Sequence, residues 1–214
     1  MNTLTKLVLG AMGQLRPEPA RGDAAGRIEL PPPQREGGRP LLEALDKRCS
    51  SREFRRDPLP LQLLSSLLWA ADGINRQGGG RTAPSALNAH EIVVYAALPQ
   101  GAYRYDPTTH ALVLAAGADI RRVTGYQDFV DDAPLDLVYV ADHARMALVP
   151  VSRQEPFAWA AAGAVAQNVY LFCAVNALSA VLRAWIDGEA IARALGLPMS
   201  QQVLLSQTVG YPGD

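Results

Sequence analysis

The segment Arg48-Cys49-Ser50-Ser51-Arg52 holds the residue types with the clearest chemical use. Its two guanidinium groups lie four positions apart, and Ser50 places a hydroxyl between them. Arginine offers a fixed charge and several planar N–H donors, so two arginines and a serine can surround a phosphate. The alternative is a solvated basic turn, because most charge runs lie on the surface. The segment is therefore a candidate phosphate site that its spacing alone does not decide.

A second cluster, Pro84-Ser85-Ala86-Leu87-Asn88, follows a glycine loop at 78–80. Small residues let a flat ligand approach the backbone closely. The Asn88 amide both donates and accepts hydrogen bonds, as the edge of a heterocycle requires. The alternative is a turn followed by a capped helix start. This cluster is also undecided when it is taken alone.

Apolar periodicity predicts the elements that position these clusters. A helix begins at Pro40 and runs towards Arg48, and the apolar face from Leu61 to Ala71 predicts a second helix that Gly73 ends. The run 156–181 predicts a long helix that is apolar on most sides, which places it at a domain centre or between subunits. A short helix is expected at 188–195. Strands are expected at 92–95, 102–105, 111–114, 135–140 and 203–209, with 102–114 forming a hairpin.

The order of these elements contains no repeating βαβ unit, so the α+β class is favoured over a doubly wound fold. Residues 14–40 hold much of the proline and glycine, which disfavour helix and strand interiors. We predict that 1–39 forms an extended, partly flexible arm and that 40–214 forms the folded domain. Trp69 and Trp159 are expected in its core.

Composition excludes several classes of function. The chain has 214 residues with 20 Lys+Arg against 21 Asp+Glu, so no global field attracts nucleic acid or an anionic membrane. Two cysteines and three histidines match no metal-ligand spacing, and no metal site is predicted. No apolar run approaches the roughly 20 residues that cross a bilayer, so no membrane span is predicted. The stretch 7–12 after Lys6 is short for a signal sequence, so a reducing, cytoplasmic location is expected over export.

Together the two clusters bring a family resemblance into view. Arg-x-Ser-x-Arg-x-Phe at 48–54, Leu-Leu-Trp-Ala-Ala-x-Gly at 67–73 and Arg-Thr-Ala-Pro-Ser-x-x-Asn at 81–88 follow one another in order. The pattern continues with Gly-Ala-x-Ala-Gln-Asn-x-x-Leu at 163–171 and Val-Gly-Tyr-Pro at 209–212. In this combination, over residues 40–212, the chain resembles the FMN-dependent nitroreductase family.

The resemblance implies a nitroreductase-like α+β fold, with a central, mainly antiparallel sheet flanked by helices and the long helix at a homodimer interface that binds FMN. Arg48, Ser50 and Arg52 match the positions that hold the FMN phosphate and ribityl chain, with Cys49 contributing backbone contacts. The isoalloxazine is approached by a segment that the other subunit supplies, and by backbone N–H groups that face flavin N5. The matching residues here are Pro84, Ser85, Ala86 and Asn88 for the first segment and Leu182, Arg183 and Ala184 for the second.

Two positions depart from the family pattern. Family members often have Gly-Leu where this chain has Ala177-Leu178, and many have a basic residue after the terminal Gly-Tyr-Pro. Here Gly213-Asp214 follows, and Arg183 is expected to replace the missing charge.

The implied activity is an oxidoreductase that passes electrons from NAD(P)H through flavin N5 to a nitroaromatic or quinone in a ping-pong cycle. No catalytic side chain is needed, because the flavin carries the chemistry. Two alternatives stay open. One is a flavin-dependent dehydrogenase that acts on a modified peptide with partner proteins, since the sequence at 58–69 is also similar to the azoline-oxidising branch of the superfamily. The other is a flavin-binding protein without turnover.

Overall fold

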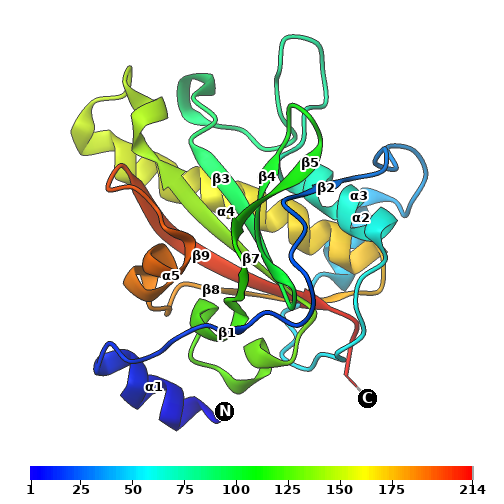
Figure 1. Ribbon diagram of the computed structural model, residues 1–214. Coiled ribbons are helices and arrows are strands. Elements are labelled where there is room, and N and C mark those ends of the chain that lie inside the picture. The colour runs from blue at the N-terminus through cyan, green and yellow to red at the C-terminus, as the bar shows by residue number, and fades with distance from the viewer. Residues whose placement is uncertain (214) are drawn as a thin grey trace.

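Seven strands form one antiparallel sheet in the order β2-β5-β4-β3-β7-β9-β8 (Figure 1). The structure, a computed structural model, describes residues 1–213. The strands are β2 Arg27–Glu29, β3 Ile92–Leu98, β4 Gly101–Asp106, β5 Ala111–Ala116, β7 Leu135–Asp142, β8 Ser179–Arg183 and β9 Gln201–Gly210. The predicted strands and the 102–114 hairpin are confirmed, and so is the α+β class.

Helices cover both faces of this sheet (Figure 1). They are α1 Thr3–Ala11, α2 Leu41–Lys47, α3 Leu61–Asp72, α4 Val151–Val175 and α5 Gly188–Leu195. Single turns of 3₁₀ helix occur at η1 Ala86–Asn88, η2 Arg121–Thr124, η3 Asp128–Asp131 and η4 His143–Met146, and a two-stranded ladder joins β1 Glu18–Pro19 to β6 Ala118–Asp119.

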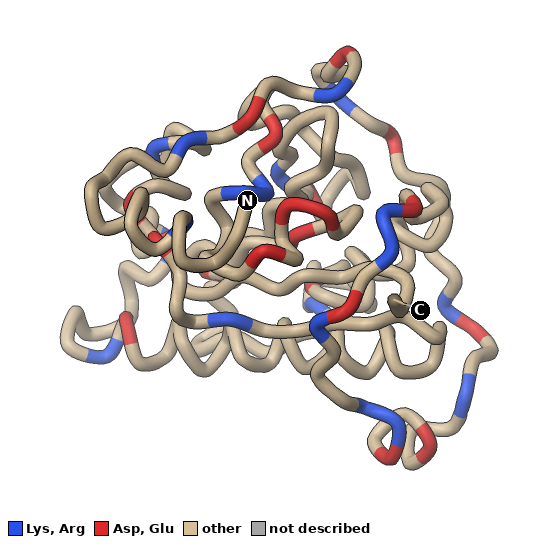
Figure 2. The backbone as a smooth tube through the Cα atoms, turned by 90° about the horizontal axis from the view of Figure 1, so that it is seen from below, with Lys and Arg blue, Asp and Glu red and all other residues tan. Residues whose placement is uncertain are grey.

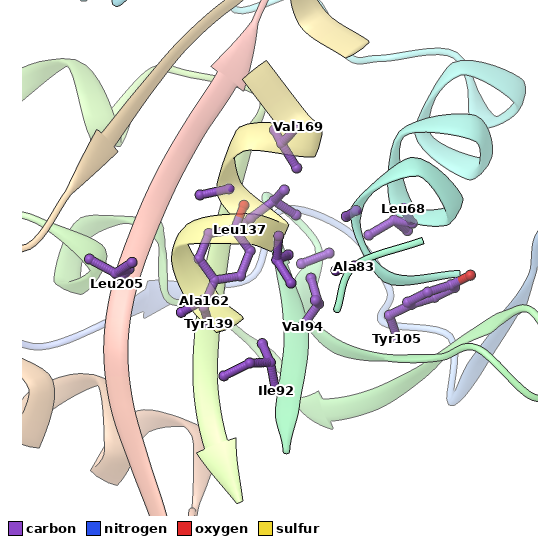
Figure 3. Close-up of a cluster of buried hydrophobic side chains, with 14 of the residues drawn as sticks. Leu68, Ala83, Ile92, Val94, Tyr105, Leu137, Tyr139, Ala162, Val169 and Leu205 are labelled. Carbon is purple, nitrogen blue, oxygen red and sulfur yellow. The ribbon is translucent and has the colours of Figure 1, made fainter. Parts of the chain in front are cut away.

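Strand β7 is buried on both faces, and its side chains alternate between the two hydrophobic cores, as the pleat requires. Leu137 and Tyr139 pack towards α4, where they meet Ala162 and Val169 (Figure 3). Val138 and Val140 point to the opposite face, where α5 packs. The sheet is thus the middle of three layers, with the larger core on the side of α3 and α4.

The long helix differs from its prediction at both ends. It begins at Val151 after Pro150, with Pro156 inside it, and it ends at Val175 instead of continuing to 181. Residues 179–183 form edge strand β8. Helix α4 is long and apolar enough to span a bilayer by length and composition, which corrects the expectation from sequence. In this fold its buried side chains belong to the core beneath the sheet.

A turn that usually needs glycine ends α4. Ala177 has φ +54°, and the Leu178 N–H donates to the Cys173 carbonyl at 3.0 Å. This six-residue closure is a Schellman motif with Ala177 at its left-handed position, where a Cβ is disfavoured. The departure from Gly-Leu that the sequence analysis noted therefore lies at a strained residue.

We expect Ala177→Gly to stabilise the protein by about 1 kcal/mol, because relief of the strain outweighs the added entropy of the unfolded chain. Urea unfolding followed by circular dichroism measures the change. Ala160→Gly in the body of α4 is the matched control, and it should destabilise the protein by about 0.5–1 kcal/mol. Equal destabilisation by both substitutions would contradict the strain at Ala177.

The N-terminal region is not extended throughout, which its composition did not indicate. Residues 3–11 form α1, whose Lys6 is fully buried and contacts Asp131 as well as the Gln127 carbonyl at 2.9 Å. Farther along, β2 adds the outermost strand on the β5 side of the sheet. The division of the chain at residue 39 stays a prediction.

Candidate functional site

The predicted phosphate segment runs along the outer edge of the sheet. Helix α2 ends at Lys47, and the chain then turns so that the Ser51 N–H donates to the Ala180 carbonyl of β8 at 3.0 Å. A β-bridge also joins Phe54 to Pro212, just after the end of β9. Residues 48–54 are thereby fixed beside β8, although they form no regular strand.

Tyr170 of α4 joins this segment to β8. Its hydroxyl lies 2.9 Å from Ser50 Oγ and accepts a hydrogen bond from the Leu182 N–H at 2.8 Å. The Arg48 guanidinium lies over the Tyr170 ring, 5.3 Å from its centroid. The first and third predicted groups of site residues therefore meet at the carboxyl-terminal half of α4.

The charges of this segment are free to meet an anion. Among residues 1–213, neither Arg48 nor Arg52 forms an ion pair, whereas Arg55 pairs with Asp57 and Arg56 with Asp132. Ser50 and Arg52 are exposed residues, and so is Cys49, whose thiol is unpaired. Two uncompensated guanidinium groups beside a hydroxyl favour a phosphate over a neutral ligand.

The backbone N–H groups of residues 182–184 point alternately away from β9 and towards it. Leu182 donates away from β9, to Tyr170, while Arg183 lies opposite Ser206 in the β8–β9 ladder. By this alternation Ala184 again points outward, and no hydrogen bond from its N–H is found among residues 1–213. Ala184 is exposed, so of the three predicted N–H groups its donor is the one that a ligand can reach.

The Arg183 side chain does not serve the phosphate segment, which corrects the expectation that it replaces a missing basic residue. Its guanidinium is buried on the opposite face of the sheet. There it pairs with Asp136 at 2.7 Å, and it donates to the Thr208 hydroxyl at 2.7 Å and the Thr124 carbonyl at 3.2 Å. The Arg183 charge is therefore compensated by buried groups and does not face the phosphate segment. A cofactor contact through the Arg183 backbone stays a prediction.

The second cluster is held in a turn by its own residues. Ser85 Oγ accepts a hydrogen bond from the His90 N–H at 2.9 Å, and Leu87 and Asn88 have left-handed φ values of +51° and +57°. At the base of the preceding loop, Arg81 forms an ion pair with Asp72. Burial raises the pKa of Asp72 to about 7, and Arg81 opposes this shift. The Arg81–Asp72 ion pair thus stabilises the loop that leads into this turn.

This turn lies over the other half of α4. Pro84, Ser85 and Ala86 line a shallow, mainly apolar cavity of about 190 Å³ together with Phe157, Ala160 and Ala161. Ala161 and Tyr170 are nine positions apart, which corresponds to roughly 13 Å along a helix. Within one chain, the second cluster therefore lies away from the phosphate segment.

The charged residues of α4, Arg153 and Glu155, both lie near its start (Figure 2), and Gln167 is an exposed polar residue farther along the helix. Phe157 is 38% exposed, and Gly163 and Ala164 at the middle of the helix are only partly covered. Leu41 and Leu42 of neighbouring α2 are 63% and 79% exposed. Apolar area of this kind on connected elements is typical of an interaction surface.

Two aromatic residues were misjudged from sequence. Tyr170 was not proposed as a site residue, because a tyrosine within a mostly apolar helix has the same pattern as a core residue. Trp159 was expected in the core, but it is 38% exposed on α4. Trp69 is partly buried, and its Nε1 donates to the Ile74 carbonyl at 3.0 Å.

Comparison with known proteins gives the same assignment from several directions. A candidate nitroreductase of Methanocaldococcus jannaschii is 32% identical over 160 residues, which are 70% of this chain and 81% of that protein. The crystal structure of a candidate nitroreductase from Ralstonia eutropha JMP134 has a TM-score of 0.90 and 51% identity, covering 94% of this chain and 96% of that one.

A more distant likeness concerns the fold alone. The NADPH:FMN oxidoreductase of Vibrio harveyi, in complex with NAD⁺, has a TM-score of 0.59 at 18% identity and covers 81% of this chain and 69% of that one. The sequence model of the Nitroreductase family matches residues 45–211, which include all three groups of site residues. The chain belongs to the nitroreductase family, which supports an oxidoreductase activity.

Proposed function

We propose that the protein is an FMN-dependent oxidoreductase that takes electrons from NAD(P)H and passes them to an electron-poor acceptor such as a nitroaromatic or a quinone. One observation carries the proposal. The free guanidinium groups of Arg48 and Arg52, the Ser50 hydroxyl and the outward Ala184 N–H lie along one edge of the sheet. An anion-binding group and a backbone donor on one edge suit a ligand that has a phosphate at one end and a ring acceptor at the other.

The donor set fits FMN. A phosphate dianion requires charge-assisted donors, which Arg48, Arg52 and Ser50 provide without a competing carboxylate among residues 1–213. The flavin N5 position requires a hydrogen-bond donor in its oxidised form, and the Ala184 N–H is free to act as one. A bound FMN would supply the redox chemistry, accepting hydride from NAD(P)H and giving electrons to the acceptor in turn.

The residues of this chain would bind FMN and hold it in a fixed orientation. Arg48 is stacked on Tyr170, so that the charge of its guanidinium is placed with little freedom. Because β8 is paired along its length with β9, the Ala184 donor extends from a rigid strand. Fixed donors stabilise developing charge without reorganisation, so no acid or base side chain is required here.

We further propose a homodimer with FMN at its interface. The two site clusters lie on either side of the middle of α4, at Ala161 and Tyr170. A two-fold axis near the uncharged middle of this helix would pair two copies in opposite directions. It would bring Pro84, Ser85, Ala86 and Asn88 of one subunit beside Arg48 and Tyr170 of the other. The exposed leucines of α2 would be covered in the same contact.

The nicotinamide donor and the acceptor would use one open site in succession, as a ping-pong cycle requires. The name of the Vibrio harveyi oxidoreductase supports FMN and NADPH as partners, and its complex supports a nicotinamide ligand. The exposed thiol of Cys49 and the buried thiol of Cys173 support a reducing, cytoplasmic location.

An absorption spectrum of the purified protein tests the function. We expect flavin bands that bleach on anaerobic addition of NADPH or NADH and return when a nitroaromatic or quinone is added. Bands that bleach without reoxidation by these acceptors would favour a different acceptor, such as a peptide. Bands that never bleach would favour a flavin-binding protein without turnover. A colourless protein that fails to take up FMN would overturn the cofactor assignment.

A further inference from the structure

The Tyr170 hydroxyl makes hydrogen bonds that the proposed function does not use. It lies in α4, is 9% exposed, and its hydroxyl contacts two groups from distant parts of the chain. One is Ser50 Oγ in the phosphate segment, and the other is the Leu182 N–H in β8. The hydroxyl is therefore the only polar group of α4 that contacts both, among residues 1–213.

The direction of these hydrogen bonds follows from the donors available. The Leu182 N–H can only donate, so the Tyr170 oxygen accepts from it at 2.8 Å. The hydroxyl proton of Tyr170 then has one hydrogen-bond neighbour among residues 1–213, which is Ser50 Oγ at 2.9 Å. If Ser50 donated instead, this proton would be left in a partly buried place without an acceptor among residues 1–213, which is costly.

We therefore assign Tyr170 as the donor and Ser50 as the acceptor, which leaves the Ser50 proton free to point away from α4. The Ser50 side chain is exposed, and it lies between the two unpaired arginines in the sequence. Its proton can therefore be donated to an anion held by these arginines. Hydrogen bonds arranged in one direction polarise one another, so each link strengthens the next.

Resting on the proposed function, we infer that Tyr170 is a positioning residue for the FMN phosphate. It relays the Leu182 N–H dipole through its own hydroxyl and fixes Ser50 as a hydrogen-bond donor to that phosphate. The same residue restricts Arg48, whose guanidinium lies over the Tyr170 ring at 5.3 Å. One side chain of the long helix thus prepares both the neutral and the charged donors of the phosphate segment.

The test compares binding of FMN with binding of riboflavin, which lacks the phosphate. In apo-protein with Tyr170→Phe we expect the Kd for FMN to rise about five- to tenfold, as the loss of one hydrogen bond predicts, and the Kd for riboflavin to change less than twofold. Ser50→Ala should show the same selectivity. The double variant should bind FMN no more weakly than the weaker-binding single variant. Tyr95→Phe, a buried tyrosine of β3 on the other face, is the control.

Ser50→Ala keeps the inference testable should Tyr170→Phe fold poorly, because Ser50 is exposed. Hydrogen exchange of the Leu182 amide gives a readout without ligand. This amide should be protected in wild-type apo-protein and should exchange faster in Tyr170→Phe. Equal loss of FMN and riboflavin binding, or additive losses in the double variant, would overturn the relay while leaving the proposed function intact. A wild-type protein that binds neither flavin would overturn both.

Discussion

Replacement of Arg183 by methionine is expected to lower the free energy of unfolding by about 3–5 kcal/mol. The Asp136 carboxylate is completely buried, and it depends on Arg183 and on the Thr208 hydroxyl for its compensation. Burial raises the pKa of Asp136, and the Arg183 charge opposes this rise. Without Arg183, a charged carboxylate would be left in the interior with one hydroxyl donor.

The loss should depend on pH in a defined direction. In Arg183→Met the folded-state pKa of Asp136 lies farther above its unfolded value, so folding favours the protonated acid. Stability is then retained at low pH and lost as the pH rises through the folded-state pKa. Urea unfolding at pH 5 and pH 8 should show the larger destabilisation at pH 8.

The paired control is the double variant Asp136→Leu with Arg183→Met, which removes both charges. It should be markedly more stable than Arg183→Met alone, since an apolar pair avoids the buried charge. An Arg183→Met variant that unfolds like the wild type but loses FMN would restore the rejected role of this side chain at the phosphate. The comparison thus separates a stabilising ion pair from a cofactor ligand.

The second large effect concerns the two unpaired arginines of the phosphate segment beside β8. We expect Arg48→Gln combined with Arg52→Gln to weaken FMN binding about a hundredfold, because two charge-assisted contacts contribute roughly 3 kcal/mol together. The stability of the apo-protein should change by less than about 0.5 kcal/mol, as expected for side chains without ion pairs. Fluorescence titration of apo-protein with FMN and thermal unfolding measure the two quantities.

A matched pair of arginines lies close by in the sequence. Arg55→Gln with Arg56→Gln removes the same charge from side chains that pair with Asp57 and Asp132. FMN affinity should then change less than about threefold, because salt screens the long-range attraction between these two arginines and the phosphate. Equal effects of the two double variants would place the phosphate elsewhere or reduce its binding to a general field.

The sequence predicts the elements better than their ends. Short helix 188–195 and the strands around 92, 135 and 203 follow from regular apolar spacing and clear turn residues. The end of α4 could not be predicted in this way. A stop signal was missing because Ala177 occupies a left-handed position where glycine usually marks the boundary. The apolar run therefore continued into β8 without a visible break.

Long-range pairing explains the other differences. Lys6 was taken for the charge before a short apolar run, but in the structure it reaches Asp131, 125 positions away. Arg183 similarly finds Asp136 across the sheet. Local patterns carry no information about such partners. For the site, the motifs indicated the backbone segments, whereas the role of Tyr170 depends on contacts from three separate elements.

The attachment of residues 48–54 to β8 has a consequence for solubility. An outermost strand presents unpaired N–H and C=O groups, which another chain can extend by intermolecular pairing. Here the Ser51 N–H pairs with the Ala180 carbonyl and so occupies part of the β8 edge. The segment that we propose to bind the cofactor therefore also covers part of the exposed edge of β8. Loss of the ligand would loosen this segment, so flavin-depleted protein should aggregate more readily than the holo form.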